Sequence, residues 1–325
     1  MSSDLRNVSN SPRYFSLAWF RFPIEPEENI KVIEVLFDII LGMSLVSNII
    51  LFWMIWKNPD KKPRSSKDLL LANLSIVNVL STLFGVVARI DNHVRPSSLS
   101  RTTLTRKAGA IMLSIILPKY YPSVFLLTLT QYGMIVKPLK FKSMDPQKVK
   151  TTMIFLSIHW VLTTAALIII PIVYEDFDKY LKVMVTVIVC LSWVIIAFIA
   201  YMFIRILHTL WKRHNDLKKR FNVSATQQGT VAIRQNTRLA RVLFVFIATL
   251  VLCSLPSNTT YLFIIHCSQC DQRVLVKACL YTLPLFLALQ VIHPIYWLIA
   301  TPTYYKELKR QARKLLVFCR CGNEN

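Results

Sequence analysis

A C-x-x-C pair is the first arrangement in this sequence that could do chemistry. Cys267 and Cys270 stand beside His266 in a polar stretch between two apolar runs. Two thiolates and one imidazole fall short of the four ligands that a structural zinc site needs, so no metal site is expected. A local disulfide between the two cysteines is the interpretation that stays open.

The second arrangement that could do chemistry is a lysine inside an apolar run. Lys119 follows Pro118 and precedes Tyr120-Tyr121-Pro122, far from either end of the run. An unpaired ammonium group at this depth of a membrane is costly, so the side chain should face the bundle interior or a water-filled cavity. Two roles remain open: a structural pair or snorkelling group, and a counter-charge for an anionic ligand.

The sequence offers no group of residues that is typical of a catalytic site. The apolar runs offer no cluster of His, Asp and Glu that could hold a catalytic metal, and no Ser-His-Asp set can be assembled from facing runs. We therefore expect no enzymatic activity and no cofactor.

Long apolar helices must position these residues. Of the 325 residues, 54% are hydrophobic and 17% are charged, which is typical of a membrane protein with several spans. A net charge of +22 would suggest nucleic-acid binding in a soluble chain, but here the basic residues lie between the apolar runs. They indicate topology instead, so no nucleic-acid partner is expected. The seven runs that can each cross about 30 Å of hydrocarbon as a helix are 33–56, 69–90, 108–136, 151–174, 181–206, 242–266 and 275–300.

The distribution of Lys and Arg gives the orientation. Segments 57–68, 137–150, 205–241 and 304–325 together hold 25 of these residues, whereas the segments on the opposite side hold 13. Cytoplasmic segments carry the positive excess, so the amino terminus should be outside. The sequon at Asn7 predicts glycosylation and agrees with that orientation.

The end of the chain predicts a surface helix. Pro294 interrupts the last apolar run, and Pro302 can open a new helix because the first turn needs no backbone donor there. Basic and apolar residues then recur at helical spacing, which is typical of an amphipathic helix at the membrane interface. Cys319 and Cys321 follow as candidates for palmitoylation.

These features predict an all-α membrane protein, a seven-transmembrane helix bundle with a short amphipathic cytoplasmic eighth helix. We expect an extracellular amino-terminal segment over 1–32, the membrane domain over 33–302, and the amphipathic helix with its cytoplasmic tail over 303–325. The expected location is the plasma membrane, where the basic cytoplasmic segments would contact anionic lipids.

Seven short motifs occur in order, one in each apolar run. They are Asn48, Asn73-Leu74-Ser75-Ile76-Val77-Asn78, Thr130-Gln131-Tyr132, Trp160, Tyr201, Cys253-Ser254-Leu255-Pro256 and His293-Pro294-Ile295-Tyr296-Trp297. Each is weak alone, but their order and spacing over 33–318 resemble the rhodopsin-like G-protein-coupled receptors. The resemblance implies a cell-surface receptor that binds an extracellular ligand and contacts a heterotrimeric G protein.

Three departures change what the resemblance implies. Gln131 stands in place of the third-span arginine, and glutamine cannot supply a permanent bidentate charge, so we expect weak, constitutive or altered signalling. Asn78 in place of the second-span aspartate removes the acid from the family's sodium pocket, so no sodium dependence is expected. The usual outer disulfide cannot form, because Arg106 stands at its third-span position and 172–182 contain no cysteine.

The resemblance also assigns roles to individual residues. Those expected in the switch and G-protein face are Thr130, Gln131, Tyr132, Tyr201, Pro256, His293, Pro294 and Trp297. Those proposed for ligand binding are Lys119, Arg106, Tyr261 and Tyr281, and the ligand is unidentified, with an anion or a peptide as candidates. Two alternatives stay open: a seven-span binding protein that does not signal, and a transporter or channel using Lys119 and His293.

Overall fold

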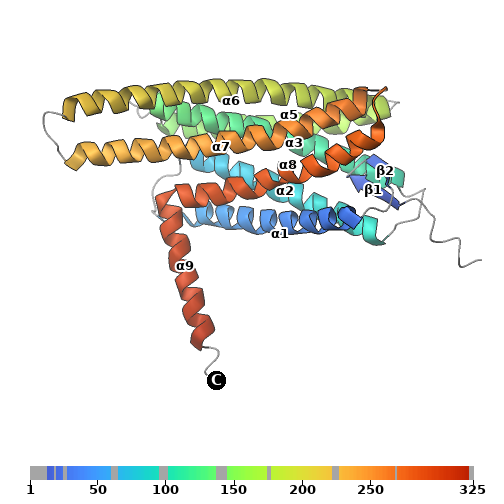
Figure 1. Ribbon diagram of the computed structural model, residues 1–325, viewed down its shortest axis with the longest axis horizontal. Coiled ribbons are helices and arrows are strands. Elements are labelled where there is room, and N and C mark those ends of the chain that lie inside the picture. The colour runs from blue at the N-terminus through green and yellow to red at the C-terminus, as the bar shows by residue number, and fades with distance from the viewer. Residues whose placement is uncertain are drawn as a thin grey trace, which may run out of the picture.

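The computed structural model is a bundle of long helices preceded by a short β-hairpin (Figure 1). The residues that it describes are 13–17, 20–24, 28–59, 65–94, 102–136, 145–173, 177–221, 227–267 and 269–321. The helices are α1 (Glu28–Lys57), α2 (Ser66–Val94), α3 (Thr102–Val136), α5 (Asp145–Val173), α6 (Phe177–Phe221), α7 (Gln227–His266), α8 (Gln272–Ala300) and α9 (Pro302–Cys321).

The hairpin is an element that the sequence did not predict. Strands β1 (Arg13–Leu17) and β2 (Phe20–Ile24) pair antiparallel, with Arg13 opposite Ile24. Aromatic and aliphatic residues recur through both strands, and such residues favour extended pairing. The surrounding polar residues masked this signal at the sequence level.

The predicted spans are confirmed as helices. Among the described residues, the helical segments long and apolar enough to cross a membrane are Val32–Lys57, Ser66–Val87, Lys182–Asp216, Phe244–His266 and Arg273–Ala300. Helices α3 and α5 hold the third and fourth predicted spans and are 35 and 29 residues long. The structure describes the side chains of those two helices only in part.

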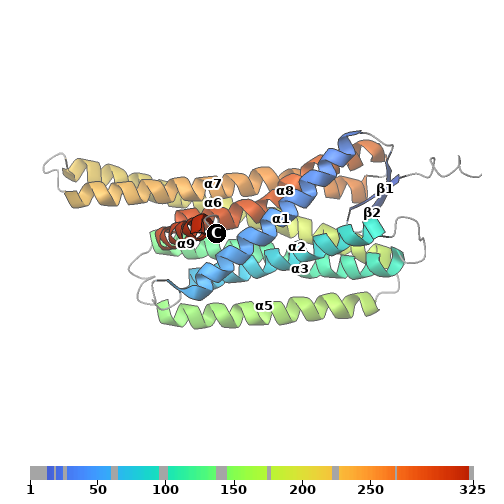
Figure 2. The same ribbon diagram turned by 90° about the horizontal axis from the view of Figure 1, so that it is seen from below.

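The helices form a closed ring with one helix outside it. In contact order the ring runs α1, α2, α3, α6, α7, α8 and back to α1. Helix α5 packs outside this ring against α2 and α3 (Figure 2). The large buried core cluster lies inside the ring, and a smaller outer cluster joins α1 to α8 through Ile33, Phe37, Val276, Cys279 and Leu280.

The fifth and sixth predicted spans extend further than expected. The sequence predicted a loop over 205–241, but α6 continues to Phe221 and α7 begins at Gln227. These extensions are polar, so the loss of hydropathy marked where the apolar run ends and not where the helix ends. Figure 1 shows α6 and α7 projecting together beyond the neighbouring helices.

Proline sets the end of the bundle as the sequence predicted. Helix α8 continues through Pro294 and ends at Ala300, and the backbone of the cap residue Thr301 is extended (φ −91°, ψ 109°). Helix α9 begins at Pro302 and leaves the bundle at a steep angle to the other helices (Figure 1). If the bundle axis is the membrane normal, α9 therefore runs along the membrane surface.

Candidate functional site

An aromatic junction occupies the interior where α3, α7 and α8 meet. We define it by Tyr120, Phe246, His293 and Trp297. A hydrogen bond of 2.9 Å joins the Tyr120 hydroxyl to Nδ1 of His293, and the imidazole stacks on Phe246 with ring centroids 4.3 Å apart. Trp297 meets Phe246 edge-on at 6.0 Å. His293 is fully buried, so a displacement of any one of these helices must disturb its contacts.

The second ring nitrogen of His293, Nε2, differs from Nδ1 in its hydrogen bonding. Within the described residues, Nε2 of His293 is buried and has no hydrogen-bond partner, and the same holds for Nε1 of Trp297. Buried polar atoms are normally paired, and exceptions gather at sites with a function. The junction therefore combines tight packing with unused hydrogen-bonding capacity.

An inner polar network joins α1, α2 and α8 beside the junction. Asn48 donates from Nδ2 to the carbonyl oxygens of Ser44 at 2.8 Å and Gln290 at 2.7 Å. Asn78 donates to Oδ1 of Asn48 at 3.1 Å. Pro294 has no N–H, so it cannot supply the helical bond to the Gln290 carbonyl four residues earlier. Asn48 supplies that bond from another helix, which explains why the asparagine and the proline occur together.

The rest of the network is also uncharged. Hydroxyl oxygens of Ser44 and Thr82 lie 2.8 Å apart, and the Gln290 side chain contacts Thr82 at 3.3 Å and donates to Ser81 at 3.0 Å. Amide and hydroxyl groups thus occupy the position at which the family has its sodium-binding acid. Hard cations prefer carboxylates, which this donor set does not offer.

The third-span motif lies near the carboxyl-terminal end of α3. Thr130 donates its hydroxyl proton to the Leu126 carbonyl at 2.8 Å, within its own helix. Gln131 is 2% exposed, and Tyr132 is half-buried against the core. A neutral amide is therefore buried where the family has an arginine.

A polar contact between α3, α6 and α7 was missed by the sequence analysis. Asn258 donates from Nδ2 to the Tyr121 hydroxyl and to Oγ of Ser192, both at 2.9 Å. It lies two residues after Pro256, which is inside α7 as expected. An asparagine in an apolar run is the signal that could have predicted it, because buried amides need partners.

Lys119 lies between α3 and α5. Its ammonium is 4.4 Å from the centroid of the Trp160 ring and donates to the Thr164 hydroxyl at 3.2 Å. The Trp160 indole donates to Oδ1 of Asn73 at 2.8 Å, and Asn73 donates to Ser123 at 2.7 Å. A cation over an indole face is a favourable desolvated pair, so these contacts account for a buried lysine without a ligand.

The other proposed ligand residues do not converge on Lys119. Tyr261 packs on the outer cluster with residues of α1 and α8. Tyr281 is 55% exposed on the surface of the bundle. Arg106 lies within α3, but its side chain is outside the described part of the chain. The described residues therefore form no single ligand site from this set.

One proposed switch residue lies apart from the rest. Tyr201 is 58% exposed on α6, on the outer surface of the bundle, and so it is not part of the buried junction. Of the proposed switch residues, His293 and Trp297 lie together in the junction, and Tyr120 and Phe246, which are not in the proposed set, complete it.

The structure describes some of the proposed modification sites and not others. Cys267 and Cys270 form a disulfide with Cα atoms 5.4 Å apart. His266 lies next to it and contacts the Thr186 hydroxyl through Nε2 at 2.7 Å. Cys319 and Cys321 fall in the last turn of α9, and the structure does not describe their side chains, while Asn7 lies outside the described residues.

Comparison with known proteins identifies the family. A search of curated proteins gives no match to the sequence. The family model described as 7 transmembrane receptor (rhodopsin family) matches residues 47–296, which is most of the chain and runs from within α1 to within α8. The protein is thus a multi-pass membrane receptor built on the seven-helix bundle, and it belongs to the rhodopsin family of seven-transmembrane receptors.

Proposed function

We propose that the protein is a plasma-membrane receptor that passes an extracellular ligand signal to a heterotrimeric G protein through the aromatic junction. Its amino terminus would be extracellular and its basic segments cytoplasmic. The ligand is unidentified, and its candidates are an anion and a peptide. The contacts of Lys119 with Trp160 and Thr164 favour a structural role for that lysine, so an anionic ligand would need other cations.

The single observation that supports this proposal is the His293 contact set. One imidazole bonds to α3 through Tyr120 and stacks on α7 through Phe246, while its own helix leads directly into α9. Packed cores have discrete arrangements, so a ligand-driven shift of α3 or α7 would change the position of α8 at this residue. The junction would couple ligand binding to helix movement, a role that sodium release and an arginine contact have elsewhere in the family.

Basal nucleotide exchange on purified G proteins tests the proposal without a known ligand. The receptor in lipid nanodiscs is mixed with one G protein of each class, and empty nanodiscs give the background. We expect exchange above background with at least one class and a lower rate for Tyr120→Phe, which removes the bond to His293. Tyr281→Phe is the matched control, because that hydroxyl lies on the bundle surface.

The buried Gln131 favours a second candidate, a receptor that binds its ligand but does not couple. Glutamine lacks the permanent charge that the family uses to contact the G protein. Gln131→Arg and Gln131→Ala separate the two candidates. Exchange at background for the wild-type protein and both variants would support the non-coupling receptor and contradict G-protein signalling.

A further inference from the structure

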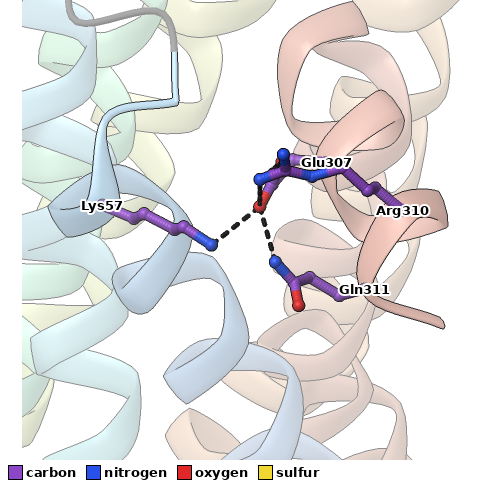
Figure 3. Close-up of polar contacts among 4 residues, drawn as sticks. All are labelled: Lys57, Glu307, Arg310 and Gln311. Carbon is purple, nitrogen blue, oxygen red and sulfur yellow. Dashed lines mark hydrogen bonds and ion pairs between the residues drawn. The ribbon is translucent and has the colours of Figure 1, made fainter. Parts of the chain in front are cut away.

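A buried carboxylate stands where α9 meets the bundle. The side chain of Glu307 is 7% exposed although it lies on a surface helix. Figure 3 shows three side chains converging on it, those of Lys57, Arg310 and Gln311. The ammonium of Lys57 and the Gln311 amide reach Oε1 at 2.8 and 2.7 Å, and the Arg310 guanidinium lies 2.8 Å from both carboxylate oxygens.

The three donors have different structural roles. Arg310 and Gln311 belong to α9, three and four residues beyond Glu307, where neighbouring side chains on one helix face meet. They fix the direction of the carboxylate. Lys57 is the last residue of α1 and crosses between helices, with its ammonium also 4.7 Å from the Trp53 ring centroid. Lys57–Glu307 is therefore the bond in this group that ties α9 to the bundle.

Hydrogen bonds keep the carboxylate ionised. Those from Arg310, Lys57 and Gln311 lower the pKa of Glu307 to about 2. A depressed carboxyl pKa contributes stability above the ordinary value of 4.5, and that contribution is lost as pH falls toward 2. The ion pair is thus intact at any physiological pH.

A second contact fixes the same turn of α9 to α2. The hydroxyl of Tyr304 donates to Oδ1 of Asp68 at 2.9 Å, and Tyr304 is 7% exposed. Ser65 holds the other oxygen of Asp68 through its backbone N–H at 3.0 Å and its hydroxyl at 2.8 Å. Tyr304 and Glu307 are one turn apart, so α2 and α1 contact neighbouring residues of α9.

The Lys57–Glu307 and Tyr304–Asp68 contacts both lie near the first turns of the long helix α9. Helix α9 has 20 residues, about 30 Å at 1.5 Å per residue. Figure 1 shows its far end well away from the other helices. A small rotation about the first turns would therefore move the last turn by a large distance.

We propose that Lys57–Glu307 is a latch, with Tyr304–Asp68 beside it, that sets the direction of α9 relative to the seven spans. Breaking the latch frees α9 to change direction, while the spans stay packed. Lys57 is the positioning residue, because it acts through Glu307. The charged restraint of this cytoplasmic face lies between α1 and α9, whereas the third span contributes the neutral Gln131.

Distance measurement between two spin labels tests the latch in the full-length receptor in nanodiscs. In a background without other reactive cysteines, the labels replace Lys212 on α6 and Ala312 on α9, which are both exposed. The unmodified latch should give one narrow distance distribution. Lys57→Met keeps most of the length of the side chain but removes its charge, so we expect the narrow peak to be lost in favour of a broad distribution.

Conservative and matched variants separate a latch from general destabilisation. Lys57→Arg keeps the charge and should keep the narrow peak, and Lys309→Met removes an exposed lysine of α9 and should leave it unchanged. Tyr304→Phe should broaden the distribution, whereas Tyr305→Phe, at an exposed neighbouring ring, should not. The thermal midpoint of the bundle should stay within a few degrees in all six variants, Lys57→Met and Glu307→Gln included. A narrow, unshifted peak in both Lys57→Met and Glu307→Gln would overturn the proposal.

Discussion

At the scale of single residues, the receptor buries neutral side chains at positions of the family's switch and sodium pocket. The imidazole of His293, the amide of Asn78 and the amide of Gln131 are all buried. Neutral groups gain less from water than ions do, so burying them is cheaper. The bonds of His293 to Tyr120 and of Asn78 to Asn48 join different helices, but none of the three groups provides a charge to be released.

Removing the Tyr120 hydroxyl should weaken the junction. Tyr120→Phe leaves Nδ1 of His293 buried without its bond, which costs about 1–3 kcal/mol of stability. The measurement is thermal unfolding of the purified receptor, followed by tryptophan fluorescence. Tyr281→Phe should leave the midpoint unchanged, and equal midpoints for the two variants would contradict the role of the bond.

Sodium should leave the wild-type receptor unaffected. The inner network offers amide and hydroxyl groups where a hard cation prefers carboxylate oxygens. Thermal unfolding in sodium chloride and in choline chloride at equal concentration should give the same midpoint. Asn78→Asp restores an acid beside Asn48 and should raise the midpoint in sodium alone. A sodium effect in the wild-type protein would refute the expectation.

Motif reasoning predicted several individual residues but not their partners. It placed His293 and Trp297 in the switch, and both are buried in the junction. It could not identify Phe246 or Asn258, because their partners come from helices far apart in sequence. Tyr201 is proposed for the same switch but lies outside the junction. Its position along α6 matches the family, but the rotation of the helix turns the ring outward, and spacing within one span does not fix that rotation.

At the scale of elements, the spans followed from hydropathy, whereas their ends did not. Apolar length is needed to cross the hydrocarbon, so each predicted span became a helix. Polar helical turns outside the membrane need no apolar residues, so hydropathy predicts a loop where α6 and α7 extend as helices. The start of α9 was predictable because Pro302 acts through local backbone chemistry.

The link between α1 and α8 can be tested with a double-mutant cycle. Asn48→Ala should lower stability by about 1–3 kcal/mol, because the Gln290 carbonyl loses its donor. Pro294→Ala restores a backbone N–H that can reach the same carbonyl. The loss caused by Asn48→Ala should therefore be smaller in the Pro294→Ala background, as measured by thermal unfolding. Additive losses would mean that the two residues do not share this carbonyl.

Docking of α9 should not respond to physiological pH. The charged groups in contact with Glu307 are Lys57 from α1 and Arg310 from α9, and the pKa of Glu307 lies near 2. Since protonation would begin only well below pH 5, the label distance between α6 and α9 should be the same at pH 8 and pH 5. Broadening at pH 5 would show that another group controls the docking.

At the scale of the whole molecule, the excess of basic residues should fix one orientation. Segments that hold 25 Lys and Arg lie on one side of the seven spans, and those with 13 lie on the other. An epitope tag at the amino terminus should be stained on intact cells, and a tag at the carboxyl terminus only after permeabilisation. Asn7→Gln should increase gel mobility by removing one glycan. Staining of the carboxyl-terminal tag on intact cells would reverse the topology.

The small loop closed by Cys267 and Cys270 has a consequence for how this receptor tolerates reducing agents. A crosslink between residues three apart removes little entropy from the unfolded chain. The family's long-range outer bridge is missing, because Arg106 stands at its position in the third span and 172–182 contain no cysteine. Stability therefore comes from packing between the helices, and the receptor should keep its fold in buffers that unfold relatives dependent on that bridge.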